Sequence, residues 1–384
     1  MTHNATLAIP AIRQPEDTRA MPALPKVMHI DFWHTMHDQS SSFVTVMQTL
    51  AHHLPGYQPL LVGSGQVRQR YVQNGLDCVD IGESRLKNRI FNKILGLDVF
   101  TYQELINLIE QERPAILHFH SRDDLVAPIL ARLSYHPCSV FQYHYHFDHI
   151  HVARELDLVL CVSHDLAAHV RRHSAIPLTI QVLPNPLPTW VAGEPLPTWT
   201  GPGALPLILY AGGGYDYKGV HEMLQAAHSL AAQRRARFEF CGVDMEHFSS
   251  DHELINISGF ITPEQLRARM AAADLVVMPS RREAFGLLAL ETMHLRRPLV
   301  TSDAGGLPEI ADAEVSFPIA STQLDRLGEH LYAVLDTLAQ SPSAVQERLE
   351  RAYQRTLHYL PEALGQRLAS LYDELLRTKT MSSD

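Results

Sequence analysis

The chain has 384 residues, of which 32 are basic and 42 are acidic, giving a formal net charge of −10. This negative balance argues against nucleic acid as a partner and provides no general attraction to anionic lipid. The length exceeds what one hydrophobic core usually fills and therefore indicates two domains. The 4 cysteines form no C-x-x-C pair, which is typical of reduced thiols in a cytoplasmic protein.

Residues 1–25 are interrupted by four prolines and carry charged side chains, so we expect them to form a flexible tail. They lack the apolar stretch of a signal peptide. The chain also has no apolar run of about 18 residues, the length that a membrane-spanning helix needs. The sequence therefore predicts a protein that is neither secreted by a standard signal nor membrane-spanning.

From residue 26 to residue 185, short apolar runs alternate with segments of helical periodicity. The predicted strands are 27–32, 59–62, 76–81, 115–119, 139–143, 158–162 and 178–183. A helix is predicted over 43–54, behind three serines that can cap it. Such β/α alternation predicts a parallel sheet covered on both faces, which is a Rossmann-like domain.

Residues 186–205 are too rich in proline and glycine for a helix or a central strand, so we assign them to a linker. The alternation then resumes and predicts a second α/β domain over 206–361. Its predicted strands are 206–211, 238–241, 255–258, 275–278 and 298–301, and its clearest helices are 220–232 and 263–272. Two such domains joined by a hinge predict a cleft between the loops at their strand ends.

The stretch SRREAFGLLALETM, residues 280–293, follows an apolar strand and opens a helix. Glu283 and Glu291 can then face one crevice, and Gly286 lacks a Cβ where a ligand approaches the backbone. The free N–H groups at a helix start suit an anion, so a sugar carrying a phosphate would fit. The alternative is that both glutamates lie on a solvated helix face.

A second candidate is GGGYDYKG, residues 212–219, which also follows a strand. Glycine amides and the mobile charge of Lys218 suit a diphosphate. A plain glycine-rich turn beside a surface lysine remains the alternative.

Together with RPLVTSDAGGLPEI at 297–310, the stretch at 280–293 resembles the retaining glycosyltransferases of family four, also called glycosyl transferases group 1. The resemblance is strong over most of 205–378 and extends to 26–185 in outline. It implies the GT-B fold, an α/β architecture in which two Rossmann-like domains face a central cleft. The first domain would bind the acceptor and the second the nucleotide-sugar donor, and a helix at 362–378 would cross back to the first domain.

By this resemblance, Glu283 contacts the donor sugar, the amides around Gly286 bind its phosphate and Glu291 binds the ribose. The family's arginine in the glycine-rich element is replaced by Gly213, and Arg281 or Arg282 could supply the charge instead. The implied donor-binding set is Gly212, Gly213, Gly214, Lys218, Arg281, Arg282, Ala284, Phe285, Gly286, Leu287 and Glu291.

In the first domain, His118 and His120 share one face at the end of a predicted strand. Relatives carry a sugar-binding histidine there, and His120 is the better match, although a histidine satisfied within a loop is the alternative. The implied catalytic residues are Glu283, His120 and Lys218, and the implied acceptor-binding residues are His34, Ser40, Ser41 and His144. The histidines of FQYHYHFDHIH, 141–151, have no cysteine close by, so we predict no metal.

The segment 84–97 mixes four basic residues with an apolar stripe. It could lie peripherally on the inner membrane, or its stripe could pack into the core.

These features predict a metal-independent retaining glycosyltransferase that acts in the cytoplasm without a cofactor. It would transfer a sugar from a UDP- or GDP-linked donor to a saccharide or lipid-linked acceptor in polysaccharide or glycolipid synthesis. Two alternatives remain open: a sugar-nucleotide epimerase on the same fold and a non-catalytic nucleotide-sugar-binding relative.

Overall fold

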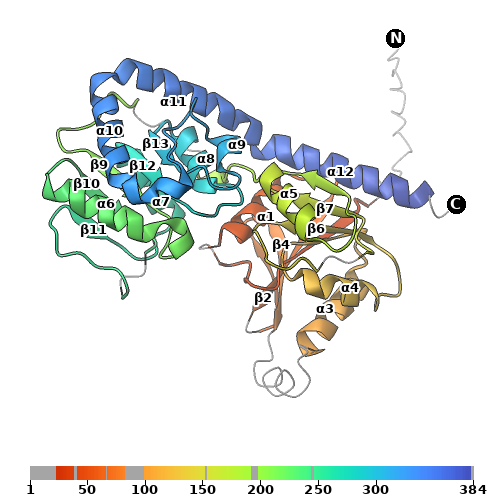
Figure 1. Cartoon of the computed structure of the whole chain (residues 1–384). Helices are drawn as coiled ribbons and strands as arrows, with labels where there is room; N and C mark the ends of the chain where they lie inside the picture. Colours follow the sequence, from red (N-terminus) through yellow and green to blue (C-terminus); the bar gives the residue numbers. More distant parts are fainter. Residues whose placement is uncertain are drawn as a thin grey trace, which may run out of the picture.

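The computed structural model describes residues 23–38, 41–65, 67–82, 99–151, 154–191, 198–243 and 246–381. The predicted helix at 84–97, the acceptor residue Ser40, residues 1–22 of the predicted tail and part of the predicted linker lie outside these residues. The chain forms two α/β domains, and a long C-terminal helix runs from the second domain along the first (Figure 1).

The first domain contains an eight-stranded sheet with the order β3-β4-β2-β1-β5-β6-β7-β8. All neighbouring strands are parallel except the edge pair β3 and β4, which is antiparallel. The strands are β1 (Lys26–Ile30), β2 (Gln58–Gly65), β3 (Gln69–Gln73), β4 (Leu76–Gly82), β5 (Ile116–Phe119), β6 (Cys138–Tyr143), β7 (Leu158–Cys161) and β8 (Ile180–Val182).

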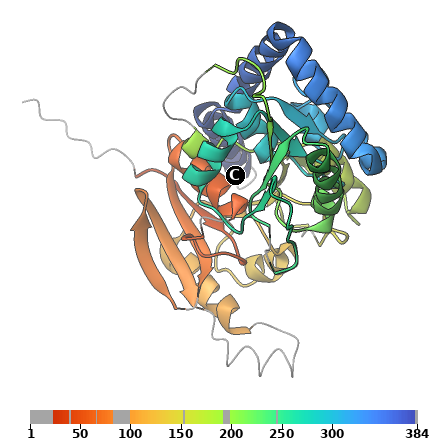
Figure 2. The ribbon, with the colours of Figure 1, turned by 90° about the vertical axis from the view of Figure 1, so that its left-hand side faces the viewer.

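The second domain contains a five-stranded, all-parallel sheet with the order β11-β10-β9-β12-β13. Its strands are β9 (Leu207–Tyr210), β10 (Arg237–Phe240), β11 (Ile255–Ile257), β12 (Leu275–Met278) and β13 (Leu299–Thr301). Figure 2 views the molecule with this domain in front and the first sheet behind it. The prediction of an α/β protein with two Rossmann-like domains is therefore confirmed.

Helices connect the strands and cover the sheets. The helices are α1 (Ser42–His52), α3 (Val99–Glu112), α4 (Val126–Leu130), α5 (His164–His173), α6 (Val220–Ala232), α7 (Pro263–Ala272), α8 (Leu287–His294), α9 (Leu307–Ile310), α10 (Leu327–Gln340), α11 (Pro342–Thr356) and α12 (Pro361–Met381). The predicted helices at 220–232 and 263–272 coincide with α6 and α7. In the part of the chain that is described, no helix combines the length and the hydrophobicity needed to cross a membrane.

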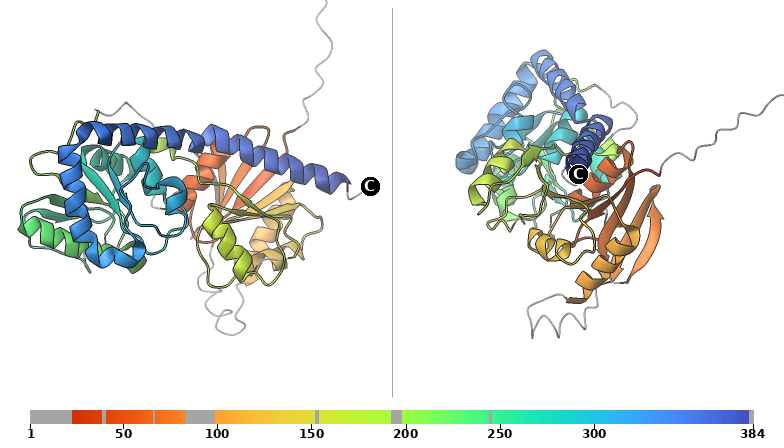
Figure 3. Two further views of the ribbon diagram at one scale, coloured as in Figure 1. Left: turned by 45° about the horizontal axis from the view of Figure 1, so that its top comes forward. Right: turned by 90° about the vertical axis from the view of Figure 1, so that its right-hand side faces the viewer.

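Helix α12 packs on the first domain although it follows the second in sequence (Figure 3). Leu368 and Tyr372 are buried in the same cluster as Val27 and Leu50. A Cβ on Gly365 would lie 1.8 Å from the carbonyl oxygen of His53, so the helix approaches the end of α1 with room only for glycine.

Helix α9 of the second domain contacts helix α5 of the first. The Glu309 carboxylate accepts hydrogen bonds from the backbone N–H groups of His164 (2.9 Å) and Asp165 (2.8 Å). These are first-turn amides that have no acceptor within their own helix. Glu309 therefore caps a helix in the other domain, and the helix dipole favours its negative charge there.

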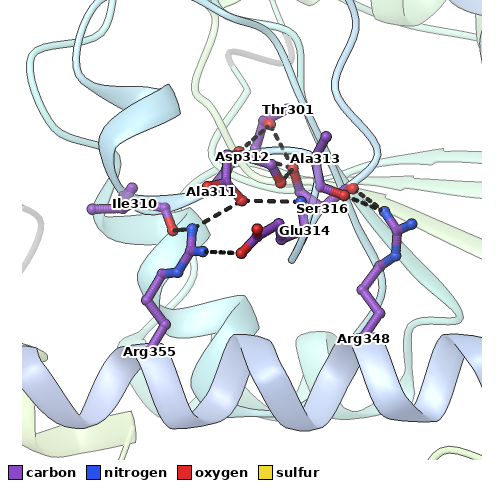
Figure 4. Close-up of polar contacts among 9 residues, drawn as sticks. All are labelled: Thr301, Ile310, Ala311, Asp312, Ala313, Glu314, Ser316, Arg348 and Arg355. Carbon is purple, nitrogen blue, oxygen red and sulfur yellow. Dashed lines mark hydrogen bonds and ion pairs between the residues drawn. The ribbon is translucent and has the colours of Figure 1, made fainter.

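Two arginines of α11 hold the segment that follows α9 (Figure 4). Arg355 donates to the carbonyl oxygen of Ile310 (3.3 Å) and pairs with Asp312 (3.0 Å). Arg348 donates to the carbonyl oxygens of Ala313 (3.0 Å) and Ser316. The position of Glu309 is thus anchored to α11.

Candidate functional site

A cleft of about 530 Å³ lies where the carboxyl ends of strands from both sheets face each other. The first domain contributes His34 after β1, His144 after β6 and Asn185 after β8. The second contributes Gly212 after β9 and Glu283 after β12. This is the position at which open α/β sheets usually bind their ligands.

Lys218 and Glu283 meet in this cleft. Lys218 ends the short 3₁₀ turn Asp216–Lys218 that precedes α6, and Glu283 lies in the loop between β12 and α8. Lys218 Nζ donates a hydrogen bond to Glu283 Oε2 at 2.6 Å. The structure thus joins two residues that are 65 positions apart in sequence and that both carry predicted site roles.

Glu291 lines the same cleft from α8 and is only 6% exposed. Burial raises the pKa of its carboxyl to about 8, because the apolar surroundings disfavour the charged form. Phe285, Gly286 and Leu287 line the cleft at the start of the same helix. The first amides of α8 have no acceptors within their helix and can therefore serve an anion.

Gly286 was expected to let a ligand approach the backbone, but the structure shows another reason for a glycine at this position. Its φ is +108°, and a Cβ would lie 2.5 Å from Leu307 Cδ2. The glycine is therefore needed for the backbone conformation and for the packing of α8 on α9. This requirement holds whether or not a ligand also approaches the backbone here. Gly305 acts similarly, because a Cβ there would lie 2.0 Å from the carbonyl oxygen of Glu283. The loop that contains Gly305 thus supports the loop that carries Glu283.

Other predicted donor residues lie around the cleft and not in its lining. Gly213 and Gly214 are absent from it, and the carbonyl oxygen of Gly213 accepts a hydrogen bond from the Tyr210 hydroxyl at 2.8 Å. Arg281 pairs with Glu222 of α6. Ala284 and Arg282 line a smaller neighbouring pocket. The proposed replacement of the missing arginine by Arg281 or Arg282 stays a prediction.

On the acceptor side, His34, Ser41 and His144 all line the cleft. The Asp31 carboxylate accepts hydrogen bonds from His34 Nδ1 (2.6 Å) and from the Ser121 hydroxyl (2.5 Å). The hydrogen bond to Asp31 raises the pKa of His34. Asp31 therefore fixes the His34 ring at the edge of the cleft.

His120, by contrast, is buried and does not line the cleft. His120 Nδ1 lies 3.0 Å from His144 Nε2, and His120 Nε2 lies 3.0 Å from His29 Nδ1. His144 thus occupies the place between His120 and the cleft. Direct contact of His120 with a sugar stays a prediction.

His29, His118 and His120 form the one group among the described residues whose spacing could hold a metal ion, with ligand atoms within 4.8 Å of one another. All three are buried, and burial lowers the pKa of each imidazole well below its usual value. This group is separate from the histidines of 141–151, which the sequence analysis considered as metal ligands. In that segment, His146 Nε2 forms a hydrogen bond with the Asp165 carboxylate at 2.7 Å.

Sequence reasoning missed the aromatic residues around the cleft. Tyr145, Tyr215, Tyr217 and Phe260 line it and have exposed side chains. Two of these aromatic residues could have been predicted, because Tyr215 and Tyr217 flank an aspartate within the glycine-rich stretch 212–219. An aromatic residue in such a turn has little core to fill, so its exposure could have been expected.

Comparison with known proteins identifies two family models in this chain. The model for glycosyl transferases group 1 matches residues 200–347, and the model for glycosyltransferase family 4 matches residues 43–190. The two matches fall on the second and first domains, respectively. Most of the residues that line the cleft therefore lie within one of the two matched ranges.

Among characterised relatives, an alpha-D-kanosaminyltransferase from Streptomyces kanamyceticus is 29% identical over 181 residues, which cover 44% of this chain and 46% of the relative. A sucrose-phosphate synthase from Thermosynechococcus elongatus has a TM-score of 0.68 at 15% identity, covering 92% of this chain and 100% of that one. A glycosyltransferase from Rickettsia africae has a TM-score of 0.71 at 14% identity, covering 92% and 98%. With its two matching family models and its GT-B fold, this chain belongs to the group 1 glycosyltransferases of family 4.

Proposed function

We propose that the protein transfers a sugar from a nucleotide diphosphate donor, UDP- or GDP-linked, to a hydroxyl of a saccharide or lipid-linked acceptor. The observation that carries the proposal is the convergence of Lys218, Glu283, the start of α8 and Glu291 on one cleft. Lys218 and the free amides of α8 suit the diphosphate of a nucleotide sugar. Glu283 suits the hydroxyls of its sugar, and Glu291 suits its ribose.

The proposed mechanism relies on placement and on charge stabilisation. Lys218 and the amides at the start of α8 would stabilise the negative charge that develops on the leaving diphosphate. Glu283 would orient the sugar hydroxyls, and Glu291 would accept hydrogen bonds from the ribose. His34 and His144 border the other side of the cleft, where the acceptor hydroxyl would approach.

Three finer features belong to the proposal. Transfer would proceed with retention of the anomeric configuration, as the family resemblance implies. It would need no metal, since Lys218 and the α8 amides can supply the positive potential that a diphosphate requires. The enzyme would act in the cytoplasm in polysaccharide or glycolipid synthesis, and the segment 84–97 would contact the inner membrane peripherally.

A thermal-shift panel of nucleotide sugars tests the donor half of the proposal. A ligand at about a hundred times its Kd stabilises the folded state by about 2.7 kcal/mol, so the correct donor should stand out. The stabilising donor is then incubated with candidate acceptors with and without EDTA, and NMR of the product reports the anomeric configuration. Conversion of the donor sugar without an acceptor would instead identify an epimerase.

A further inference from the structure

A second pocket of about 220 Å³ adjoins the cleft and shares Tyr145, Tyr217, Lys218 and Glu283 with it. It is lined by Tyr145, His146, Tyr217, Lys218, Arg282, Glu283 and Ala284. Residues 145 and 146 belong to the first domain, and the other five belong to the second. The pocket therefore spans the two domains next to the point where the donor sugar would lie.

The pocket combines aromatic rings from both domains. Tyr145 and Tyr217 are both partly exposed and line the same pocket, so their rings are accessible to a ligand there. Tyr145 is braced by Phe43, with ring centroids 4.5 Å apart. The Tyr217 ring stacks on that of Tyr215, with ring centroids 5.5 Å apart. Rings fixed in this way suit the flat face of a cyclic ligand.

The pocket also contains an arginine whose charge is poorly compensated. Arg282 Nη2 donates to the carbonyl oxygen of His146 at 3.1 Å and lies 3.8 Å from the exposed carboxylate of Asp148. A contact of that length between exposed groups contributes little. A guanidinium has five N–H donors, so most of those on Arg282 remain available to a ligand. The other cation of the pocket, Lys218, is already neutralised by Glu283.

We propose that this pocket is an acceptor subsite for a sugar ring that carries an anionic group, a phosphate or a carboxylate. Arg282 binds the anion, and Tyr145 and Tyr217 contact the ring. The planar fork of arginine matches both oxyanions, which is why the two share one subsite chemistry. The assignment rests on the proposed transferase function, because it places the acceptor beside Glu283 and the donor sugar. It also gives Arg282 a different role from the donor-binding one predicted above.

Three probes with the same ring test the subsite: glucose, glucuronic acid and glucose 6-phosphate. Their binding is measured by ligand-observed NMR on the full chain in the presence of saturating UDP or GDP, whichever binds. We expect both charged probes to bind at least about tenfold more tightly than glucose, the effect of one charge-assisted hydrogen bond. Arg282→Gln should abolish that preference.

Two further variants separate the subsite from its surroundings. Tyr217→Ala should weaken all three probes by a similar factor, since it removes a ring contact and no charge. Arg281→Gln is the matched comparison, because Arg281 is the adjacent arginine but pairs with Glu222 outside the pocket. Whatever it does to nucleotide binding, this variant should keep the preference for charged probes.

Four results would overturn the proposal: equal affinities of the wild type for charged and neutral probes, no binding of any probe up to about 10 mM, loss of the preference in Arg281→Gln, or an equal loss of nucleotide affinity in Arg282→Gln. The last result would indicate that Arg282 binds the donor phosphate, as the sequence analysis predicted. Failure of the transferase proposal is distinguishable, because it would appear as a lack of sugar transfer to any acceptor in the product assay, whereas the preference for charged probes is measured by binding alone.

Discussion

Lys218 Nζ lies 2.6 Å from Glu283 Oε2, so the cation expected to hold the donor diphosphate already has a carboxylate partner in the cleft. The two charges neutralise each other while the cleft contains no substrate. A diphosphate must therefore compete with Glu283 for Lys218, whereas the sugar of a complete donor offers Glu283 hydroxyl groups in exchange. The pair can favour the intact donor over the product nucleotide.

Removal of the Glu283 charge should strengthen binding of the product nucleotide. We expect Glu283→Gln to bind UDP or GDP about three- to tenfold more tightly, because Lys218 no longer has a competing anion. The sugar-linked donor should gain less. Isothermal titration of both ligands measures the difference, with Glu329→Gln on α10 as a remote control. Weaker binding of the diphosphate by the Glu283 variant would contradict the expectation.

Nucleotide binding should release protons near neutral pH. The raised pKa of about 8 keeps the Glu291 carboxyl mostly protonated at pH 7 before a nucleotide binds. Ribose hydroxyls that donate to it would favour the carboxylate and lower this pKa, so up to one proton should leave per nucleotide bound. Calorimetry at pH 7 in buffers of different ionisation enthalpy counts that proton. Glu291→Gln should abolish the release. An unchanged proton count in this variant would show that another group releases the proton.

Stability should fall on acidification below about pH 6.5. Burial lowers the pKa of His29 to about 3 and that of His144 to about 4, and it lowers those of His118 and His120 well below the usual value. The unfolded chain binds these protons below its own pKa of about 6.5, while the folded state does not, so acid favours unfolding. Each such group contributes up to about 1.4 kcal/mol per pH unit between the two pKa values.

Urea unfolding at a series of pH values measures this slope. Replacement of His29 by leucine should reduce the number of protons taken up on unfolding by about one near pH 5. Replacement of the exposed Gln225, which has no ionisable group, by leucine should leave it unchanged. A slope that is the same in all three proteins would show that the buried histidines are already protonated in the folded state.

The cap that Glu309 provides should hold the two domains in the arrangement seen in the structure. Glu309→Ala should cost about 0.5–2 kcal/mol, the usual effect of losing a helix cap, and should broaden the range of interdomain distances. Small-angle scattering follows the shape, and thermal unfolding follows the stability. Glu329→Ala removes an exposed carboxylate on α10 that pairs with Arg326, away from the contact between α9 and α5, and serves as the control. An equal effect of both substitutions would exclude a specific role for the cap.

The sequence predicted the strands of the second domain closely because each is a short apolar run bounded by turn residues. It missed β3, whose residues QRYVQ are mostly polar. An edge strand with one covered neighbour does not need an apolar face, so hydrophobic periodicity cannot detect it.

The site was predicted unevenly for a similar reason. Residues on one continuous segment, such as Glu283 and Glu291, could be assigned together because strand, turn and helix fix their relative positions. His120 and His144 come from different strands, and their order relative to the cleft depends on side-chain packing across the sheet. The exposed pocket at Tyr145 and Arg282 depends on how the domains face each other. No local pattern contains that information.

The crossing of α12 back to the first domain also affects the order in which the protein can be completed during synthesis. The cluster around Val27 and Leu50 includes Leu364, Leu368 and Tyr372, which the ribosome adds more than 300 residues later. The first domain therefore leaves the ribosome with part of its interior uncovered, and it must wait through translation of the entire second domain. During that interval the exposed apolar surface is a site for chaperones or for misassociation. The last helix thus acts as the closing step of folding for the domain that was made first.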